Sequence, residues 1–557
     1  MSRLLLVTGA LRFTAPFAIG GGEPAPGTDR PLLRDDGDRP ALPGTTIAGA
    51  LRGPLERLAP HADLEGLRGN ALVEDLFGSA LDNARGGTPS HLAIADPTPL
   101  GDVAVSVRDG VGIDRASGAA RKAIKYDLEI AGVGARYQLE LALDLEHGEK
   151  TLTAGDRRRI GLLALGLSGW TAGRGSLGGR AGTGLGAFVL EDLDARLVDL
   201  TDPEVLSSWL RARPDAGERR DLVDGQPLGD RFDLLGHCPA LRGGAAGDGT
   251  SPGQVRVTVA LDAPDPLLIA GLTPLRARPE AAEKEQKVED ADAQPLTRPT
   301  PGGGAEAVLS GSAARGVLRS RVERIVRTFA GPRWQIAACD PHRKEVSCAV
   351  QAAELHEATR NDSPAERRTL APKLAADVRR KVCPACRLFG NAALGGRVVV
   401  EEVVLSSEPP AVLDHVAVDR FTGGAADARK FDAAPLPSAR AVTVVSVDRP
   451  ARWEVALLLL ALRDLCDGWV ALGSRGTRGY GRVLGRVERI DLHSTEDGPL
   501  ALLCDGREGA WRVGSLAPSG PGFLDGIGDT ATELLDAGVT ELEACVREWC
   551  DDQRGGA

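Results

Sequence analysis

The sequence predicts an α+β fold that occurs twice in one chain, with an antiparallel sheet in each copy. The first observation is that three sequence landmarks occur twice in the same order. They are a Gly-containing helix entry that ends in Leu-Arg, a Leu-Phe-Gly tripeptide and a glycine-rich loop. They lie at 42–52, 76–78 and 178–186, and again at 309–319, 388–390 and 473–481. Such internal repetition indicates a duplicated domain. The second observation is that short strand-like and helix-like stretches mix in each copy without regular βαβ alternation, which favours α+β over a parallel sheet.

Composition sets the broad class of the protein. The 557 residues are 42% hydrophobic and 26% charged, as in ordinary globular proteins. The sequence contains no run of about 18 apolar residues, so it predicts no membrane span. The apolar stretch at the start of the chain is too short for a signal peptide. We therefore expect a cytoplasmic protein with no membrane contact.

Charge leaves the class of partner open at this point. The formal net charge of −11 argues mildly against nucleic acid, but binding depends on local charge. Two basic clusters stand out, one of five arginines over 315–327 and one formed by Arg379, Arg380, Lys381 and Arg387. Each is typical either of a solvated helix face or of a surface that binds a polyanion.

The elements follow in order along each copy. Strands are expected at 4–12 and 255–261, because each is an apolar stretch that leads into a loop rich in Gly, Pro and Asp. Apolar residues recur every three to five positions from Leu309 to Val326, which predicts an amphipathic helix with Ser310 or Ser312 as N-cap.

The later elements of each copy lie between its second and third landmarks. β-Branched residues predict strands at 398–404 and 441–447. Apolar runs predict helices at 453–465 and, in the first copy, at 160–167.

These elements divide the chain into domains. We expect a first domain at 1–200, a loop-rich connection at 201–253, a second domain at 254–493 and a C-terminal extension at 494–557 with a helix at 530–549. The offset between the copies grows from 267 at the helix entry to 312 at Leu-Phe-Gly, so the second copy carries an insertion of 45 residues.

The insertion, at about 331–386, carries a candidate zinc site. Cys383-Pro384-Ala385-Cys386 has the spacing of a metal knuckle, and Cys339 and Cys348 can complete a tetrahedral shell, with His342 as an alternate ligand. A hydrophilic insertion without a core of its own gains stability from a metal. Unrelated thiols are the alternative, and a redox role lacks the thioredoxin-like context.

The glycine loops are candidates for phosphate contact. Glycines let a backbone approach a ligand closely, and their N–H groups can cradle phosphates. Neither loop matches a P-loop or a dinucleotide fingerprint, and each precedes a strand. Arg180 lies in the first loop, and Arg475, Arg478 and Arg482 are interleaved with the second, which suits a polyphosphate backbone.

A third candidate is Asp29, which follows a glycine- and proline-rich stretch at 20–27. A loop aspartate can hold a divalent cation or position an attacking hydroxyl. An ordinary turn residue is the alternative for this position.

Together these motifs resemble the RAMP superfamily of CRISPR–Cas effectors, most closely the backbone subunit of type III complexes. The family pattern is a Gly-Gly turn, an Asp-x-Pro segment and a Pro-Gly-Ser helix entry, and its glycine loop ends in Gly-Tyr-Gly. The matching segments are 29–35, 43–52, 388–390, 397–400, 418–425 and 476–483. The likeness covers about 1–195 and 254–490, as in a tandem fusion of two backbone domains of the type III-D kind.

The resemblance implies an RRM-like, modified ferredoxin-like fold in each half and binding of guide crRNA through its phosphates. A thumb β-hairpin is implied from Val111 to Tyr126 and from Val418 to Phe431. The residues implied to contact RNA are Gly44, Thr45, Arg52, Arg180, Ser310, Ser312, Arg315, Arg319, Arg420, Arg475, Arg478 and Arg482.

The resemblance also implies cleavage of target RNA with Mg or Mn, with Asp29 as the catalytic residue of the first half. In the second half, alignment on Pro295 places Ala293 where the aspartate is expected. Asp292 is adjacent and Asp290 is close, so either can serve, and an inert second site is the alternative. The implied partners are crRNA, target RNA and other Cas subunits. A non-catalytic scaffold and a crRNA-processing ribonuclease are the alternatives. The latter is disfavoured because no histidine is next to a glycine loop in the sequence.

Overall fold

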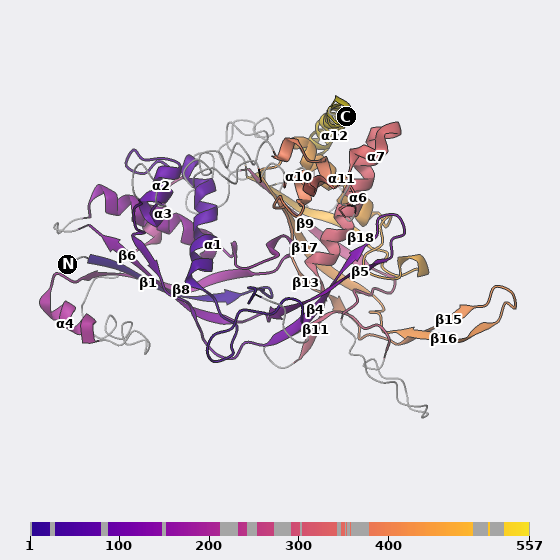
Figure 1. Ribbon diagram of the computed structural model, residues 1–557, viewed down its shortest axis with the longest axis horizontal. Helices are drawn as coiled ribbons and strands as arrows, with labels where there is room; N and C mark the ends of the chain where they lie inside the picture. The colour runs from indigo at the N-terminus through magenta and orange to yellow at the C-terminus, as the bar shows by residue number, and fades with distance from the viewer. Residues whose placement is uncertain are drawn as a thin grey trace.

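The computed structural model describes most of the chain. The described residues are 3–22, 28–79, 87–146, 152–211, 232–241, 253–271, 291–300, 304–341, 343, 347–350, 353, 357, 378–493, 511–512 and 529–555. His342 and Asp290 lie outside them. Figure 1 shows two bodies in which helices cover a sheet, joined side by side. No helix in the described part of the chain is long and apolar enough to cross a membrane.

The first half is an antiparallel sheet with helices on one face. The strand order is β2-β6-β1-β8-β7, with β3 also on β6. The strands are β1 (Arg3–Phe13), β2 (Leu92–Ile94), β3 (Thr98–Pro99), β6 (Arg136–Leu145), β7 (Gly175–Ser176) and β8 (Ala187–Asp199), and the covering helices are α1 (Gly44–Leu58), α2 (Asn70–Phe77) and α3 (Ala154–Thr171). The core lies between the two layers and is built from alternate strand residues and the apolar side chains of α1 and α3.

The second half repeats this arrangement. Its strand order is β12-β17-β9-β18-β19, with β14 on β17. The strands are β9 (Gln254–Ala263), β12 (Val398–Val400), β14 (Ser406–Ser407), β17 (Ala439–Asp448), β18 (Leu484–His493) and β19 (Trp511–Arg512), and the helices are α6 (Gly311–Ala330), α7 (Trp334–Ala337), α10 (Pro384–Phe389) and α11 (Arg452–Cys466). A small sheet of β10 (Thr297–Pro299), β11 (Ala305–Leu309) and β13 (Val403–Val404) adjoins it. The expected α+β duplication with antiparallel sheets is therefore confirmed.

Local sequence explains most element bounds. The Ser310 hydroxyl accepts a hydrogen bond from Ala313 N at 3.3 Å and caps α6, as predicted. Ser312 is not the cap, since its hydroxyl instead bonds Ser310 Oγ at 3.1 Å. The strand expected at 398–404 is divided between β12 and β13.

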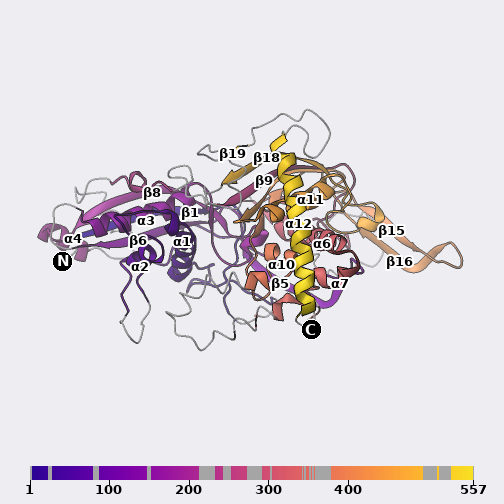
Figure 2. The same cartoon turned by 90° about the horizontal axis from the view of Figure 1, so that it is seen from above.

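Two regions outside the repeats, the expected linker and the C-terminal extension, contain helices. The supposedly loop-rich connection begins with a helix, α4 (Pro203–Arg211), whose Val205 packs on Val198 of β8. The last described element is α12 (Asp529–Gly555), which runs across the helical layer of the second half and buries Leu542, Val546 and Trp549 (Figure 2).

Two β-hairpins extend from the sheets at corresponding places. One is formed by β4 (Val105–Ile113) and β5 (Ala120–Ala131), the other by β15 (Leu413–Val418) and β16 (Ala425–Ala433). Their turns are alike because the side chains of Asp114 and Asp419 each accept hydrogen bonds from the backbone N–H groups two and three positions later. The first hairpin lies against the second half, whereas the second projects from the body of the protein (Figure 1).

Candidate functional site

The first hairpin and the first glycine loop form the contact between the halves. Arg115, next to the hairpin turn, donates from Nε to Glu323 Oε2 of α6 at 2.8 Å, and the Glu323 side chain is only 1% exposed. Arg108 of β4 pairs with the buried carboxylate of Glu402. In the loop, Thr183 O lies so close to Gly311 that a Cβ on this glycine would approach it to 2.3 Å. Gly311 is therefore required at the start of α6 by a neighbouring backbone.

A carboxylate, an aromatic ring and an arginine meet at the base of the first hairpin. Asp29 is exposed, and its Oδ2 accepts the N–H of Asp127 at 3.0 Å. The next residue towards the hairpin turn, Tyr126, carries the Arg180 guanidinium over its ring at 4.5 Å from the centroid. A hydrogen bond and charge repulsion from Asp109 raise the pKa of Asp127, which shows that acidic groups crowd this place.

The second half has the same constellation. Asp292 Oδ2 accepts the N–H of Asp432 at 3.2 Å, and Asp292 N donates back to Asp432. Phe431 holds the place of Tyr126, with Arg475 and Arg478 over its ring at 5.3 and 4.8 Å. Arg180 and Arg475 both adopt the left-handed conformation, with φ of 63° and 62°. The structure thus brings residues from three distant segments together twice.

The register of the two halves corrects the alignment on Pro295. Leu33 N bonds Ile19 O at 2.7 Å in the first half, and Leu296 N bonds Ile269 O at 2.6 Å in the second. Leu296 therefore corresponds to Leu33. With this correspondence, Asp292 and not Ala293 is the equivalent of Asp29 in the second half. The assignment of Ala293 to the aspartate position was wrong because the prolines at 31 and 295 differ by one place in register.

A histidine lies beside the second glycine loop, contrary to the sequence expectation. His415 Nε2 is 2.9 Å from the hydroxyl of Tyr480, and its ring stacks on Phe431 with centroids 5.1 Å apart. Partial burial, with Arg475 and Arg478 nearby, lowers the pKa of His415. His415 and Tyr480 are 65 positions apart, which hides this contact in the sequence.

The two arginines of α6 that were predicted to contact RNA are used within the protein. Arg315 donates to Phe389 O at 2.7 Å and to Val398 O at 3.2 Å, and burial lowers its pKa to about 10. Arg319 donates to Glu323, to Gly390 O and to Cys386 Sγ. Both side chains tie α6 to the segment around Leu-Phe-Gly.

The remaining predicted contact residues are spread over both halves. Gly44 is buried with its N–H on Asp96 at 2.6 Å, Thr45 is exposed, and Arg52 pairs with Glu56 at 2.9 Å. Arg420 and Arg478 are exposed, and Arg482 is a distant 3.9 Å from Asp265. Arg475 has a buried Nη1 that finds no hydrogen-bond partner among the described residues.

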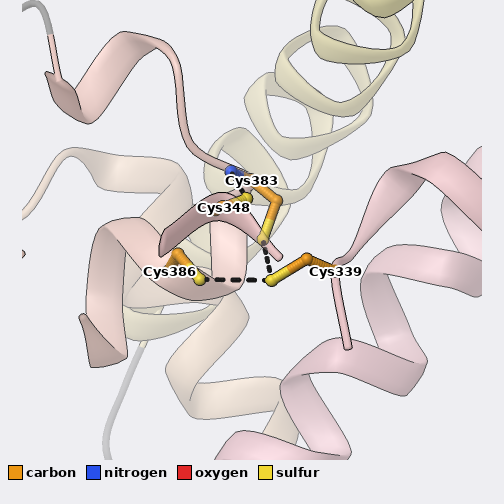
Figure 3. Close-up of side chains that lie close together, drawn as sticks. All are labelled: Cys339, Cys348, Cys383 and Cys386. Atoms are coloured by element: carbon orange, nitrogen blue, oxygen red, sulfur yellow. Dashed lines mark hydrogen bonds between the residues drawn. The ribbon is translucent and has the colours of Figure 1, made fainter. Parts of the chain in front are cut away.

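Cys339, Cys348, Cys383 and Cys386 form a buried cluster, as predicted (Figure 3). Their sulfur atoms all lie within 4.8 Å of one another. The Cys339 sulfur is 3.5 Å from that of Cys386 and 3.9 Å from that of Cys383. Four sulfurs around a zinc ion at about 2.3 Å would be about 3.8 Å apart, so this donor set fits a structural zinc.

Hydrogen bonds among the four cysteines lower the pKa of Cys339 and Cys383 and raise the pKa of Cys348 and Cys386, so they favour a thiolate at two of the four positions. Hydrogen bonds from the thiols of Cys339, Cys348 and Cys386 hold the pKa of Cys383 well below its usual value. The Cys348 sulfur accepts the Cys383 N–H at 3.3 Å, and the Arg319 guanidinium is 3.5 Å from Cys386. No other group of possible metal ligands of this kind occurs in the part of the chain that the structure describes.

The comparison with known families agrees with this duplicated geometry. A model of the RAMP superfamily matches residues 10–189 and 293–484, which together make up more than half of the chain. The chain belongs to the RAMP superfamily. No curated protein is similar enough to count as a match.

The two matched regions assign one RAMP unit to each sheet-and-helix body. Membership supports a CRISPR-associated RNA-binding role, with RNA and Cas subunits as partners. Both Asp29 and Asp292 fall close to or within the matched regions, and the four cysteines lie within the second RAMP region.

Proposed function

We propose that this RAMP protein is a subunit of an RNA-guided type III CRISPR effector, of the III-D kind, that holds guide crRNA and cleaves target RNA. The observation that carries the proposal is the repeated base of the hairpin. There, an exposed aspartate lies beside an aromatic ring and an arginine, held by the same backbone hydrogen bond in both halves. Arginine and aromatic rings are the groups that hold RNA phosphates and unstacked bases.

The catalytic part of the proposal rests on Asp29 and Asp292. Each is exposed to an incoming strand, and each is oriented by the N–H that it accepts. The oxygen ligands at each site, Asp29 with Asp127 and Asp292 with Asp432, suit Mg or Mn, which commonly bind one or two carboxylates together with substrate phosphates. Such a cation would polarise the scissile phosphate. The aspartate would then position the attacking 2′-hydroxyl.

The second glycine loop is the proposed RNA contact that is easiest to test. Replacing Arg475 and Arg478 by Gln should weaken guide RNA binding at least about tenfold, because each guanidinium makes a charge-assisted phosphate contact. The slope of log K against log salt should also become shallower by about 1.4 for two lost single-strand phosphate contacts. Fluorescence anisotropy over a salt series measures both.

The matched control replaces Arg68 and Arg157 by Gln. Both are half-exposed arginines on the helical layer of the first half, where they pair with Asp63 and Glu65. This control should bind RNA as the unaltered protein does. Equal affinity and equal salt slope in the loop variant would contradict the proposed contact.

The second hairpin is the proposed contact for another subunit. Within the chain, Arg115 of the first hairpin binds Glu323, which is also held by Arg319 at 2.9 Å. Arg420 occupies the place of Arg115 but is exposed at the end of the free hairpin. We assign Arg420 to an equivalent protein contact with a RAMP-type domain of a neighbouring subunit.

The first half offers the complementary surface. Arg52 and Glu56 repeat the Arg319–Glu323 pair, with the same 2.9 Å distance, but the Glu56 side chain is 48% exposed because no hairpin covers it. We therefore propose that another subunit contributes a hairpin here.

Arg420→Glu should weaken addition of the neighbouring subunit about a hundredfold, since breaking a desolvated ion pair costs about 3 kcal/mol. Sedimentation of reconstituted complexes measures this assembly. Arg324→Glu, an exposed position on α6, is the control and should assemble normally. Normal assembly by the Arg420 variant would overturn the assignment.

A guide-processing ribonuclease is a second candidate, favoured by one observation. His415 and Tyr480 form a hydrogen-bonded pair beside the second glycine loop, within reach of Arg475 and Arg478. The lowered pKa of His415 provides a neutral imidazole near pH 7, as a general base requires. Cutting of a crRNA precursor by the isolated chain, abolished in His415→Ala, would favour this candidate over the first.

A further inference from the structure

Arginines surround a surface cavity on the helical side of the second half, away from the hairpins. The cavity has a volume of about 240 Å³ and lies between the segment before α10, the end of β17 and the start of α11. The basic cluster noted at 379–387 in the sequence contributes three of its arginines, and two more come from distant segments. Its walls include Arg379, Arg380, Arg387, Arg397, Arg449 and Trp453.

Some of these arginines have structural duties. Arg397 bonds Glu454 and three backbone carbonyls, and Arg387 bonds the carbonyls of Val382 and Arg380. Both line the cavity, and hydrogen bonds hold their guanidinium groups in place. They contribute positive electrostatic potential from fixed positions rather than side chains that can rearrange around a ligand.

Other arginines at the cavity are less well satisfied. The Nε of Arg379 is buried and has no hydrogen-bond partner in the described part of the chain. Burial, then repulsion from Arg397 and Arg449, lowers the pKa of Arg379. Arg449 is half-exposed and, within the described residues, pairs with its neighbour Asp448 at 3.3 Å.

Positive charge exceeds negative charge at this place. Five arginines line the cavity, against the single carboxylate of Glu454. Asp448 lies beside it and is shared between Arg449 and, at 3.9 Å, Arg57 of the first half. An anion entering the cavity would relieve the repulsion among guanidinium groups.

The first half builds the corresponding framework without two of these arginines. His91 N bonds Leu76 O as Arg397 N bonds Leu388 O, so His91 stands where the second half has Arg397. By the matching helix ends at Gly78 and Gly390, Asp75 stands where the second half has Arg387. An arginine at each of these two positions is therefore specific to the second half.

We propose that this cavity binds a phosphate group of a nucleotide or of an RNA strand. Arginine presents planar pairs of N–H donors that match phosphate oxygens. Trp453 adds a flat apolar wall, already stacked under Arg387 with 5.8 Å from guanidinium carbon to ring centroid, on which a base can rest. The site is separate from the hairpin bases, so it stands or fails independently of the proposed cleavage.

The test measures pyrophosphate binding to the full chain by isothermal titration calorimetry at fixed salt. Arg379→Gln/Arg449→Gln should weaken binding about a hundredfold, about tenfold for each lost guanidinium. Arg379→Lys/Arg449→Lys keeps the charge and should retain part of the affinity, which separates loss of the site from loss of folding. Arg440→Gln/Arg489→Gln alters two exposed arginines of the same half and should bind normally.

Two competitors identify the source of the phosphate. Displacement of pyrophosphate by a 12-nucleotide single-stranded RNA, but not by ADP, assigns the cavity to an RNA backbone, and the reverse assigns it to a free nucleotide. The proposal is overturned if the unaltered chain does not bind pyrophosphate or if the Gln variant binds it equally well. It is also overturned if an oligoglutamate peptide binds the cavity more tightly than pyrophosphate, which would make the ligand an acidic protein.

Discussion

Cys383→Ser/Cys386→Ser should abolish zinc binding and lower the melting temperature of the second half by about 10–20 °C. The expected loss is about 5 kcal/mol, because a buried structural metal contributes its binding free energy to folding. The four cysteines are buried at the junction of α10 with the segment after α7, where they form part of the core of the second half. Elemental analysis and calorimetry of the purified chain give the zinc content and the transition.

The control for this result is Cys466→Ala. Cys466 is buried in α11 outside the cluster, and burial raises the pKa of its thiol to about 12, so it is an inert core residue. This variant should keep one zinc per chain and lose only the stability expected for one trimmed core side chain. Equal zinc content in the unaltered chain and the double serine variant would rule out the cysteine site.

Loss of zinc should also loosen the contact between the halves. Arg319 links Cys386 to Glu323, and Glu323 in turn binds Arg115 of the first hairpin. Without a metal to order the cysteines, Arg319 loses one of the groups that fix it beside Glu323. Faster hydrogen exchange in β4 and β5 of the zinc-free chain is therefore part of the expected result.

Much of the fold could be predicted because its signals are local or repeated. Cys383 and Cys386 are separated by two residues in a chelating motif, and the paired Leu-Phe-Gly segments reveal the duplication without any structure. The hairpins were expected from a family resemblance, and both are present. Because the domain occurs twice, each copy could be compared with the other, which is not possible in a sequence with a single copy.

The rest depends on contacts that the sequence does not encode locally. Asp292 and Asp29 correspond only when backbone hydrogen bonds define the register, because Pro295 misleads a comparison of residue types. His415 and Tyr480 meet only because a hairpin strand folds back onto the glycine loop. Arg315 resembles a solvent-facing RNA contact in the sequence, but tertiary packing uses it to bind carbonyl groups.

Asp29→Asn and Asp292→Asn should each remove one cut from the target RNA. Asparagine keeps the size of the side chain and can still accept the N–H of Asp127 or Asp432, but it lacks the charge that would hold a cation or activate a hydroxyl. The rate at the affected position should fall at least about a hundredfold, which is the usual contribution of such a group. Binding of guide RNA should change little, because the arginines and rings remain.

Asp262→Asn is the control for cleavage. Asp262 lies in β9, is half-exposed and pairs with Arg440 at 3.2 Å, away from both hairpin bases. Its replacement should leave both cuts and their rates unchanged. Omission of Mg and Mn from the reaction should suppress both cuts in every variant without disturbing the zinc content.

The most direct test of the account is fragment mapping of an end-labelled target RNA by the reconstituted effector complex. The account predicts two cuts that depend on this subunit: one lost in Asp29→Asn, the other lost in Asp292→Asn, and both lost in the double variant. An unchanged fragment pattern in the double variant, with normal complex assembly, would contradict cleavage by this chain and leave it as a scaffold that holds RNA.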